Sequence, residues 1–432
     1  MQTRFTAEQL SDPATQDSER NIRACVHCGF CLSTCPTYTL LGDELDSPRG
    51  RIYMIKDMLE HDRPASREVV THVDRCLSCL ACMTTCPSGV HYQHLIDHAR
   101  SHVEATYRRP FFDRRLRQVL AWLLPSPDRF RMALLAARPF RSLARFVSGR
   151  LGAILALTPA GLPRRSNEEG RVAFPAIGSR RARVALLTGC AQRVLAPSIN
   201  EATIRLLTRH GVEVSVPKGS GCCGAIVHHL GKAEPARELA IRTMAAWMDE
   251  ITGEGLDAII VNTSGCGTEI KDYGHIFRDD PVWAEPARQI SVLARDISEF
   301  AADLELRCDP PRLDRPVVAY HAACSLQHGQ KITRQPKELL ERAGFAVRDV
   351  PEGHLCCGSA GTYNLLQPEI AGRLRDRKIE NIARLAPEFI ATGNIGCITQ
   401  LASGTDIPVV HTVELLDWAT GGPIPGALVR KA

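Results

Sequence analysis

Short apolar runs alternate with longer amphipathic stretches through the second half of the chain. Three runs, at 184–187, 212–216 and 258–262, have the length of buried strands, and helical stretches separate them. A second series, at 317–320, 346–350 and 388–392, repeats this order. Strands that alternate with helices predict two parallel α/β modules.

The first hundred residues have a helical pattern instead. Ser47 followed by Pro48 is a helix start, because serine caps helices and proline suits the first turn. The apolar face that follows holds Ile52, Ile55, Met58 and Leu59. We expect an α+β multidomain protein with a mostly helical domain at 1–105, a linker at 106–180, and duplicated α/β modules at 181–305 and 314–432.

The linker is strongly basic. Between Arg108 and Arg150 there are eleven arginines and two acidic residues, with apolar blocks at 119–124 and 132–137. Short basic amphipathic helices bind an anionic membrane surface or a partner subunit, and a solvated helical linker is the alternative. The longest apolar stretch, at 151–163, is too short to span a bilayer, so we expect any membrane contact to be peripheral.

Composition narrows the class of protein. The chain has 432 residues, enough for two or three domains, and 44% of them are hydrophobic, which suffices for real cores. The net charge of +5 is modest, so we expect no nucleic-acid partner. Residues 1–10 have no apolar run typical of a secretory signal, and we expect a cytoplasmic protein, peripheral to the inner face of the membrane.

Eight of the seventeen cysteines form two copies of one motif, 51 residues apart. The spacing, Cys-x2-Cys-x2-Cys-x3-Cys-Pro, is the ligand pattern of a two-cluster bacterial ferredoxin, in which the fourth cysteine binds the other cluster. We therefore predict two [4Fe-4S] clusters. Their ligands are Cys25, Cys28, Cys31 and Cys86 for the first cluster, and Cys35, Cys76, Cys79 and Cys82 for the second.

Disulfides and zinc are the alternatives for these eight cysteines. Disulfides need an oxidising compartment, which the N-terminal sequence does not indicate. Zinc sites use paired Cys-x-x-Cys units, which would not explain a third cysteine at the same interval followed by Cys-Pro, twice. Iron-sulfur clusters are the stronger interpretation.

A second set of cysteines is duplicated together with the α/β modules. Three of them recur 134 residues later and the fourth 131 residues later, always just after a predicted strand. Ligand sites in open α/β sheets gather at the carboxyl ends of strands, so we expect one site per module. A further iron-sulfur cluster, a zinc ion, a redox-active thiol pair and free buried thiols all remain open. The two sets are Cys190, Cys222, Cys223 and Cys266, and Cys324, Cys356, Cys357 and Cys397.

Gly219, Gly221 and Gly224 match the spacing of a dinucleotide-binding loop. The second module keeps Cys-Cys-Gly but has Leu355 in place of the middle glycine, so we assign no nicotinamide or flavin loop to this chain.

Three histidines lie near the duplicated cysteines: His228, His229 and His321. A histidine in such a place can bind a metal or relay a proton, but we interpret all three as hydrogen-bonded polar residues near strand ends. Cys308 has no counterpart in the repeat, and we interpret it as structural.

Further motifs surround the cysteines: Cys35-Pro36-Thr37-Tyr38, Ser47-Pro48-Arg49-Gly50-Arg51-Ile52, Asn262-Thr263-Ser264-Gly265-Cys266-Gly267, the run from His354 to Tyr363, and Asn394-Ile395-Gly396-Cys397. With these motifs the chain resembles a family that joins a two-cluster ferredoxin domain to tandem Cys-Cys-Gly domains. The family includes lactate-utilisation proteins, the third subunit of anaerobic glycerol-3-phosphate dehydrogenase and heterodisulfide reductase subunits. Within it, the chain is most similar to the iron-sulfur subunit of glycolate oxidase.

The resemblance implies an electron-transfer subunit of a glycolate oxidase or dehydrogenase complex. Glycolate is then oxidised to glyoxylate on the FAD of a partner subunit, and electrons leave through this chain towards a quinone or another membrane acceptor. No catalytic residue is expected in this chain. The alternatives are the same role with D-lactate, L-lactate or glycerol 3-phosphate, or a thiol/disulfide enzyme of the heterodisulfide reductase kind.

One departure from the family pattern matters. Reductase-type modules end in Cys-x-x-Cys, whereas Thr263 and Asn394 replace the first cysteine of that pair here. Each site therefore has four thiolates in place of five. This difference counts against a non-cubane cluster and against disulfide-reductase chemistry.

Overall fold

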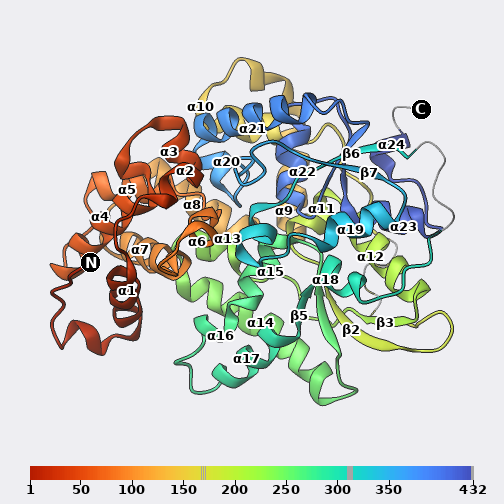
Figure 1. Ribbon diagram of the computed structural model, residues 1–432, viewed down its shortest axis with the longest axis horizontal. Helices are drawn as coiled ribbons and strands as arrows, with labels where there is room; N and C mark the ends of the chain where they lie inside the picture. The colour runs from red at the N-terminus through yellow and green to blue at the C-terminus, as the bar shows by residue number, and fades with distance from the viewer. Residues whose placement is uncertain (167, 169, 171, 309–314, 430–432) are drawn as a thin grey trace.

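The N-terminal helices form one end of the molecule (Figure 1). The computed structural model describes residues 1–432 except 167, 169, 171, 309–314 and 430–432. Residues 1–106 contain helices and loops, as the sequence pattern predicts. The elements are η1 (Gln9–Ser11), α1 (Pro13–Ala24), α2 (Phe30–Thr34), α3 (Pro36–Leu41), η2 (Glu44–Asp46), α4 (Pro48–Glu60), α5 (Arg67–Asp74), α6 (Ala81–Thr85) and α7 (Tyr92–Thr106).

Helix α4 begins where the sequence predicts. The Ser47 hydroxyl accepts a hydrogen bond from the backbone N–H of Gly50 at 3.0 Å, and Pro48 occupies the first turn. The predicted apolar face is buried in the core of this domain, and it consists of Ile52, Ile55, Met58 and Leu59.

The predicted linker is packed against its neighbours. It forms α8 (Phe111–Leu123), α9 (Pro127–Ala137), η3 (Arg138–Arg145) and α10 (Gly149–Leu157). Leu120 of α8 and the following Leu124 lie in one small core with Leu230 of the first module and Leu366 of the second. These helices therefore contact both modules.

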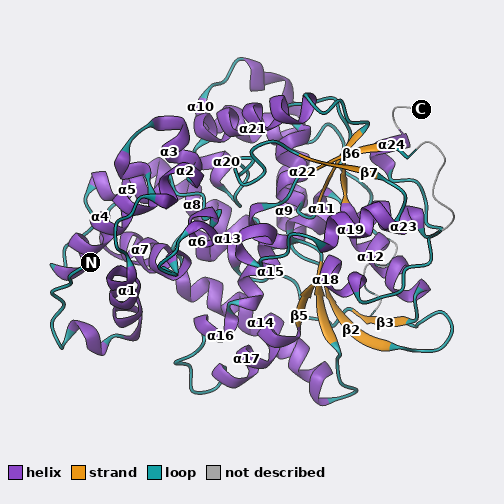
Figure 2. Ribbon diagram, in the orientation of Figure 1, coloured by secondary structure: helices purple, strands orange, loops and turns teal. Residues whose placement is uncertain are grey.

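Two separate sheets follow (Figure 2). The first module contains β1 (Ala173–Phe174), β2 (Ala182–Leu187), α11 (Ala191–Leu195), α12 (Ser198–Arg209), β3 (Val212–Ser215), α13 (Ala225–His229), α14 (Ala233–Thr252), β4 (Ala258–Val261), α15 (Ser264–Lys271), α16 (Tyr273–Ile276), α17 (Ala284–Leu293), β5 (Ala294–Asp296) and α18 (Ile297–Ala302). The second contains β6 (Val317–Tyr320), η4 (Ser325–Gly329), α19 (Gln335–Arg342), β7 (Ala346–Asp349), α20 (Tyr363–Leu366), α21 (Pro368–Ala383), β8 (Phe389–Thr392), α22 (Ile395–Ala402), β9 (Val409–His411), α23 (Thr412–Ala419) and α24 (Gly426–Val429).

The sheets share one topology. Their strand orders are β1-β3-β2-β4-β5 and β7-β6-β8-β9, and every pair is parallel except β1 with β3. The six strands and the parallel arrangement predicted from sequence are therefore confirmed, with ends that shift by one or two residues. Strands β1, β5 and β9 were not predicted, because two or three residues at a sheet edge leave almost no periodic pattern. Strand β1 lies within the segment assigned to the linker, so the first sheet begins before residue 181.

The two modules pack against each other through equivalent helices. Helix α12 of the first module contacts α23 of the second, and α18 of the first contacts α19 of the second. Helices α12 and α19 follow the first strand of the repeat in their modules, so the two contacts are related by an approximate two-fold axis. A single hydrophobic core continues across this interface, from Leu186 and Leu207 to Tyr320 and Leu416.

Across the part of the chain that the structure describes, no helix is both long and apolar enough to span a bilayer.

Candidate iron-sulfur sites

The first ferredoxin-type motif surrounds a cavity at the surface. Five cysteines line it together with apolar residues of α4 and the loops: Cys25, Cys28, Cys31 and Cys86, which are the predicted ligands of the first cluster, and Cys82. Cys28 is exposed, and its neighbours Val26 and Phe30 are 67% and 61% exposed. The three-cysteine run of one motif and the last cysteine of the other therefore meet here, at a solvent-facing edge.

A second cavity lies deeper. Its cysteines are Cys35, Cys76, Cys79 and Cys82, and all four are buried. Cys82 also lines the first cavity, so the two cavities share a wall. The two linings together contain all eight cysteines of the two motifs, and the division of these cysteines between two clusters stays a prediction from the motif spacing.

The two cysteine loops have the same backbone conformation. The residues on either side of the second cysteine take positive φ angles in each loop: His27 at 55° and Gly29 at 86°, and Ser78 at 48° and Leu80 at 60°. Left-handed residues curl a short loop tightly, which lets successive cysteines face one point. The repeat seen in the sequence is thus also a repeat of conformation.

An arginine lies beside the second cavity. The Arg51 side chain is 1% exposed, and its Nη1 lies 3.9 Å from the sulfur of Cys35. The carboxylate of Asp46 binds it, and the same carboxylate binds His72 and Arg75 at 2.8 Å each. Arg51 belongs to the predicted helix but faces the cluster cavity, which sequence periodicity alone does not reveal.

Tyr92 adds a second hydrogen-bond donor at this cavity. Its hydroxyl donates to the sulfur of Cys76 at 3.8 Å, and burial raises the pKa of this hydroxyl well above its usual value. The hydroxyl therefore keeps its proton. Hydrogen bonds to cluster sulfurs raise reduction potentials, so Arg51 and Tyr92 both favour a more easily reduced group here.

The donor set of both cavities fits iron-sulfur clusters. Burial raises the pKa of Cys31 to about 11, and raises the pKa of Cys79 and Cys82 well above the usual thiol range. Such sulfurs become anionic at neutral pH when a metal replaces the proton. Soft thiolates in sets of four are typical ligands of iron-sulfur clusters.

In each α/β module the four cysteines meet at the carboxyl ends of the strands. Cys190 follows β2, Cys222 and Cys223 follow β3, and Cys266 lies just beyond β4. In each sheet the first strand of the repeat (β2 or β6) lies between the second (β3 or β7) and the third (β4 or β8). The chain therefore reverses its winding direction beside β2 and beside β6. This switch point is where open α/β sheets bind ligands.

The adjacent cysteines of each pair contact different partners. The thiol of Cys222 donates to the sulfur of Cys190, which lowers the pKa of Cys190, and the thiol of Cys223 donates to Cys266. The second module has the same pairing: the sulfurs of Cys324 and Cys356 are 3.7 Å apart, and Cys357 contacts Cys397.

Both the backbone angle and the available space require a glycine after each cysteine pair. Gly224 and Gly358 have φ angles of 88° and 89°, which other residues rarely adopt. A Cβ atom would also lie 2.7 Å from the carbonyl oxygen of Ala236 in the first module, and 2.5 Å from that of Ala371 in the second. The Cys-Cys-Gly unit is therefore a fixed turn.

The two residues that replace a cysteine behave differently. The Asn394 amide donates to the sulfur of Cys397 at 3.6 Å, whereas the Thr263 hydroxyl donates to Gln192. The second site thus gains a hydrogen-bond donor to sulfur that the first lacks.

The structure confirms the interpretation of His228 and corrects that of His229 and His321. His228 is hydrogen-bonded to Glu269 at 2.8 Å, as expected, whereas Nδ1 of His229 lies 3.9 Å from Asp97 and has no hydrogen-bond partner among the described residues. Neither ring nitrogen of His321 has a hydrogen-bond partner among the described residues, contrary to the prediction from sequence. Burial lowers the pKa of His321 to about 3, so the ring is neutral.

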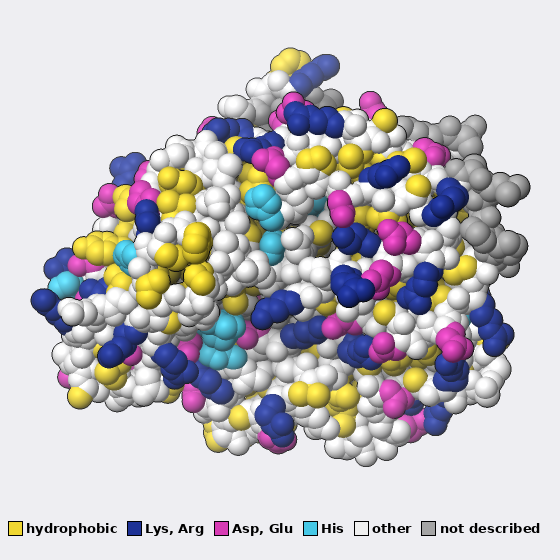
Figure 3. All heavy atoms as spheres, in the orientation of Figure 1, with side chains coloured by type: hydrophobic (Ala, Val, Ile, Leu, Met, Phe, Trp, Pro, Cys, Tyr) yellow, Lys and Arg dark blue, Asp and Glu magenta, His cyan; other side chains and the backbone are white. Residues whose placement is uncertain are grey.

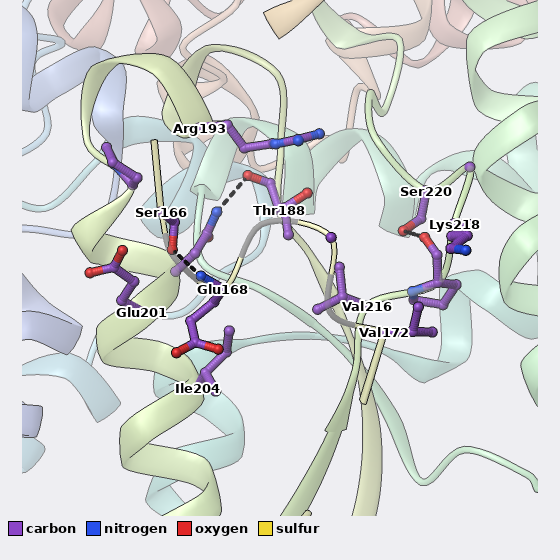
Figure 4. A pocket seen from close by; sticks show the side chains of 15 residues that line it. Ser166, Glu168, Val172, Thr188, Arg193, Glu201, Ile204, Val216, Lys218 and Ser220 are labelled. Carbon is purple, nitrogen blue, oxygen red and sulfur yellow. Dashed lines mark hydrogen bonds between the residues drawn. The ribbon is translucent and has the colours of Figure 1, made fainter. Parts of the chain in front are cut away.

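A separate pocket lies beside the glycine-rich loop of the first module (Figure 4). Figure 4 shows it between helix α12, which carries Glu201 and Ile204, and the loop of Lys218 and Ser220. Among the described residues, its lining contains two cations, two carboxylates and no cysteine. The duplicated cysteine site does not extend into this pocket.

The second module's cysteines lie against the ferredoxin-type domain. Cys79 and Cys356 belong to one buried cluster, and Cys324 packs against it. The hydroxyl of Tyr363 donates to the backbone oxygen of Arg75 at 3.0 Å at the same contact. Cys223 and Cys266 of the first module belong to a different core.

Comparisons with known proteins agree with this architecture. Residues 21–90 match a 4Fe-4S dicluster domain, and residues 184–271 and 318–402 each match a cysteine-rich domain. A solved structure of a hypothetical protein from Helicobacter pylori covers 99% of this chain and 75% of its own, with a TM-score of 0.54 and 10% identity. That likeness concerns the fold alone.

Curated relatives match over nearly the full length. The glycolate oxidase iron-sulfur subunit of Escherichia coli K12 is 42% identical over 422 residues, 97% of this chain and 99% of the relative. A Bacillus subtilis protein named "Probable glycolate oxidase iron-sulfur subunit" is 30% identical over 93% of this chain and 95% of its own length. Lactate utilization protein A of Geobacillus thermodenitrificans is 28% identical over 54% of this chain. The chain therefore belongs to the family of glycolate oxidase iron-sulfur subunits.

Proposed function

We propose that this chain carries electrons from an FAD-containing partner subunit, which oxidises glycolate to glyoxylate, towards a quinone. The observation that carries the proposal is the pair of adjoining cavities, whose linings together contain all eight cysteines of the two motifs and share Cys82. [4Fe-4S] clusters accept and donate single electrons when bound in such cavities. The protein's own part is to hold them close together and to shield the inner one from water.

We assign the ligands from the spacing of the motifs, and the cysteines that line the two cavities support this assignment. The first cluster is bound by Cys25, Cys28, Cys31 and Cys86, and the second by Cys35, Cys76, Cys79 and Cys82. Since Cys82 borders both cavities, one ligand shell separates the two clusters. Short separations favour rapid electron exchange.

The two cavities differ in access, which gives the path a direction. The outer cavity has the exposed Cys28 at its edge, with Val26 and Phe30 beside it, so an electron donor can approach it closely. Exposed apolar side chains around such an opening are typical of a docking surface. The inner cavity adjoins Cys324 and Cys356 of the second module instead.

The basic helical region is the surface we assign to the membrane. Among the described residues, ten of the nineteen exposed large hydrophobic side chains lie between 111 and 151, including Phe112, Trp122 and Phe146. Eleven arginines accompany them between 108 and 150. Apolar side chains among arginines suit the headgroup region of an anionic bilayer, where a quinone is accessible.

The membrane assignment has a direct test. Trp122→Glu and Phe146→Glu should each reduce co-flotation with vesicles that contain anionic phospholipid. A carboxylate at these positions opposes both the insertion of apolar side chains and the attraction of the arginines to anionic headgroups. Val292→Glu is the matched control, since Val292 is 74% exposed on α17 outside this region. Equal flotation of all four proteins would contradict the assignment.

The electron-transfer proposal is tested with the complex. The chain is purified anaerobically with its flavoprotein partner, and glycolate, D-lactate, L-lactate and glycerol 3-phosphate are added separately. We expect glycolate to bleach the flavin and then to produce the EPR signal of reduced clusters, and a soluble quinone to reverse both. A chain that contains zinc and no iron would overturn the proposal, and a response to another substrate alone would reassign the donor.

A further inference from the structure

The two duplicated sites differ at one position in the first strand of the repeat. Leu187 ends β2 three residues before Cys190, and His321 follows β6 three residues before Cys324. Both side chains are almost fully buried. The duplication therefore places an apolar side chain in one site and an imidazole in the other.

The His321 ring lacks partners where it would normally need them. It is 1% exposed, and within the described residues neither Nδ1 nor Nε2 has a hydrogen-bond partner. A buried polar group without a hydrogen bond destabilises the fold, because it has lost its contacts with water. An ordered water, an ion or a functional role of the group is the usual explanation for such an unpaired group in a native protein.

The ring faces the sulfurs of its own site. One ring nitrogen of His321 and the sulfurs of Cys357 and Cys397 all lie within 4.8 Å of one another. Cys356 contacts Cys357, and its sulfur is 3.7 Å from that of Cys324. Five potential ligand atoms therefore form one continuous group.

A buried cation distinguishes the second site as well. Lys378 of α21 is 2% exposed and lies close enough to Cys356 and Cys357 to interact electrostatically. Since Ala236 and Ala371 make the same contact with the Cys-Cys-Gly turn, the equivalent residue in the first module is Thr243. A positive charge beside buried sulfurs favours their anionic, metal-bound form.

We propose that His321 is a direct ligand of an iron-sulfur centre in the second module, alongside Cys324, Cys356, Cys357 and Cys397. The inference deepens the proposed electron-transfer function and rests on it. Five donors exceed the four positions of a tetrahedral zinc ion, and sulfur with imidazole nitrogen is an established ligand set for iron-sulfur centres. The first module, with Leu187, offers no such nitrogen.

Mixed ligation has a measurable consequence. A neutral imidazole adds no negative charge, so a centre that it ligates is easier to reduce than one held by thiolates alone. Its nitrogen also couples magnetically to an unpaired electron on the iron. This coupling reports ligation directly and does not depend on enzyme activity.

The test uses the full chain, purified anaerobically with natural-abundance or ¹⁵N-labelled histidine. Pulsed EPR of the paramagnetic state should show a strong ¹⁴N coupling that histidine labelling converts to ¹⁵N. His321→Leu, which copies the first module, should lose this coupling together with the iron above the about eight atoms of two [4Fe-4S] clusters. His321→Cys should keep the iron and lose the coupling, and His228→Gln should change neither.

The outcomes separate the two proposals. A strong histidine coupling that persists in His321→Leu or His321→Cys would overturn the ligand assignment. So would a wild-type chain with about eight irons and no histidine coupling, although the signals of two ferredoxin-type clusters would leave the proposed function intact. Absence of those signals from the wild-type chain would contradict the proposed function itself. If His321→Leu fails to fold, the His321→Cys protein decides.

Discussion

Thr84 and His328 are hydrogen-bonded across the contact between the ferredoxin-type domain and the second module, with 2.8 Å between Oγ1 and Nδ1. The other ring nitrogen of His328 lies 3.2 Å from the backbone oxygen of His354. A carbonyl only accepts, so Nε2 carries the ring proton and Nδ1 accepts from the threonine hydroxyl. Thr84 lies two residues after Cys82, and His328 four after Cys324. The bond therefore fixes two cysteine sites relative to each other.

Replacing Thr84 tests this contact. Thr84→Val keeps the shape but leaves Nδ1 of His328 without a donor, which should lower the free energy of unfolding by about 1–2 kcal/mol. Thr84→Ser keeps a hydroxyl and is the matched control. Denaturant unfolding of the anaerobic full chain measures both, and equal stability of the valine and serine variants would contradict the assigned bond.

Cys79→Ser tests the division of labour between subunits. Loss of one ligand should remove about four irons, because a [4Fe-4S] cluster needs four protein ligands. In the complex, glycolate should still reduce the flavin, but quinone reduction should stop. Cys308→Ala is the control, since Cys308 belongs to neither cysteine set, and it should keep both activities. Loss of flavin reduction in Cys79→Ser would contradict this division, because it would show that the oxidation of glycolate on the flavin itself depends on the clusters.

Tyr92→Phe tests how the chain tunes the inner cluster. The variant removes the hydroxyl that donates to the sulfur of Cys76 and changes little else. A hydrogen bond worth about 1 kcal/mol corresponds to about 40 mV for one electron, so the reduction potential should fall by that amount. EPR-monitored redox titration measures the shift. Iron content should stay unchanged, and an unaltered potential would exclude this hydroxyl as a tuning group.

Gly50→Ala should damage the inner site through the backbone. A Cβ atom at Gly50 would lie 2.1 Å from the carbonyl oxygen of Glu44, so η2 and α4 must separate. Asp46 of η2 binds Arg51 of α4, and both should shift. We expect a loss of about 2 kcal/mol or more and reduced iron content.

Gly372→Ala is the matched control for that substitution. Gly372 lies in α21, and a Cβ atom there meets nothing within 4 Å. The change should stabilise the chain by about 0.5–1 kcal/mol, because alanine favours helix. Calorimetry and iron analysis compare the two variants, and equal effects would refute the steric explanation of Gly50.

Stability should depend on pH through His94, which joins the N-terminal domain to the first module. Its ring binds Asp17 at 3.5 Å and Asp272 at 3.0 Å, and it stacks on His275 with 3.3 Å between ring centroids. Figure 3 shows histidines gathered on this face between the N-terminal helices and the first module. Burial alone would lower the pKa of His94, but the two carboxylates raise it to about 9.

The pKa shift of His94 determines how the free energy of unfolding changes with pH. A pKa raised from 6.5 to about 9 stabilises the fold fully below pH 6.5, and this contribution is lost as the pH rises through 9. His94→Gln should therefore be less stable than wild type by up to about 3 kcal/mol at pH 6, and nearly equal above pH 9. Thermal unfolding of both proteins at pH 6, 7.5 and 9.5 measures the gap. A gap that does not change with pH would contradict the assignment.

Local features of this chain could be predicted from its sequence. The cysteines of each ferredoxin-type loop lie within eleven residues, and the six principal strands are continuous apolar runs, so short segments carry their own signal. The duplication likewise locates Cys190 and Cys324 at equivalent strand ends. Arg51, by contrast, is visible in the sequence only as part of a motif. Its contact with Cys35 depends on how α4 packs, which the local sequence does not show.

What the sequence by itself determined was the set of cysteines, their order along the chain and the repeated α/β pattern. The tertiary structure decided that Cys79 lies against Cys356 of the second module, and that the buried ring of His321 has no partner among the described residues. Both facts depend on contacts between elements far apart in the chain. The spacing of cysteines predicts local loops, because the contacts within each loop join residues that are close in the chain. The docking of one domain on another depends on surfaces that exist only after each domain has folded.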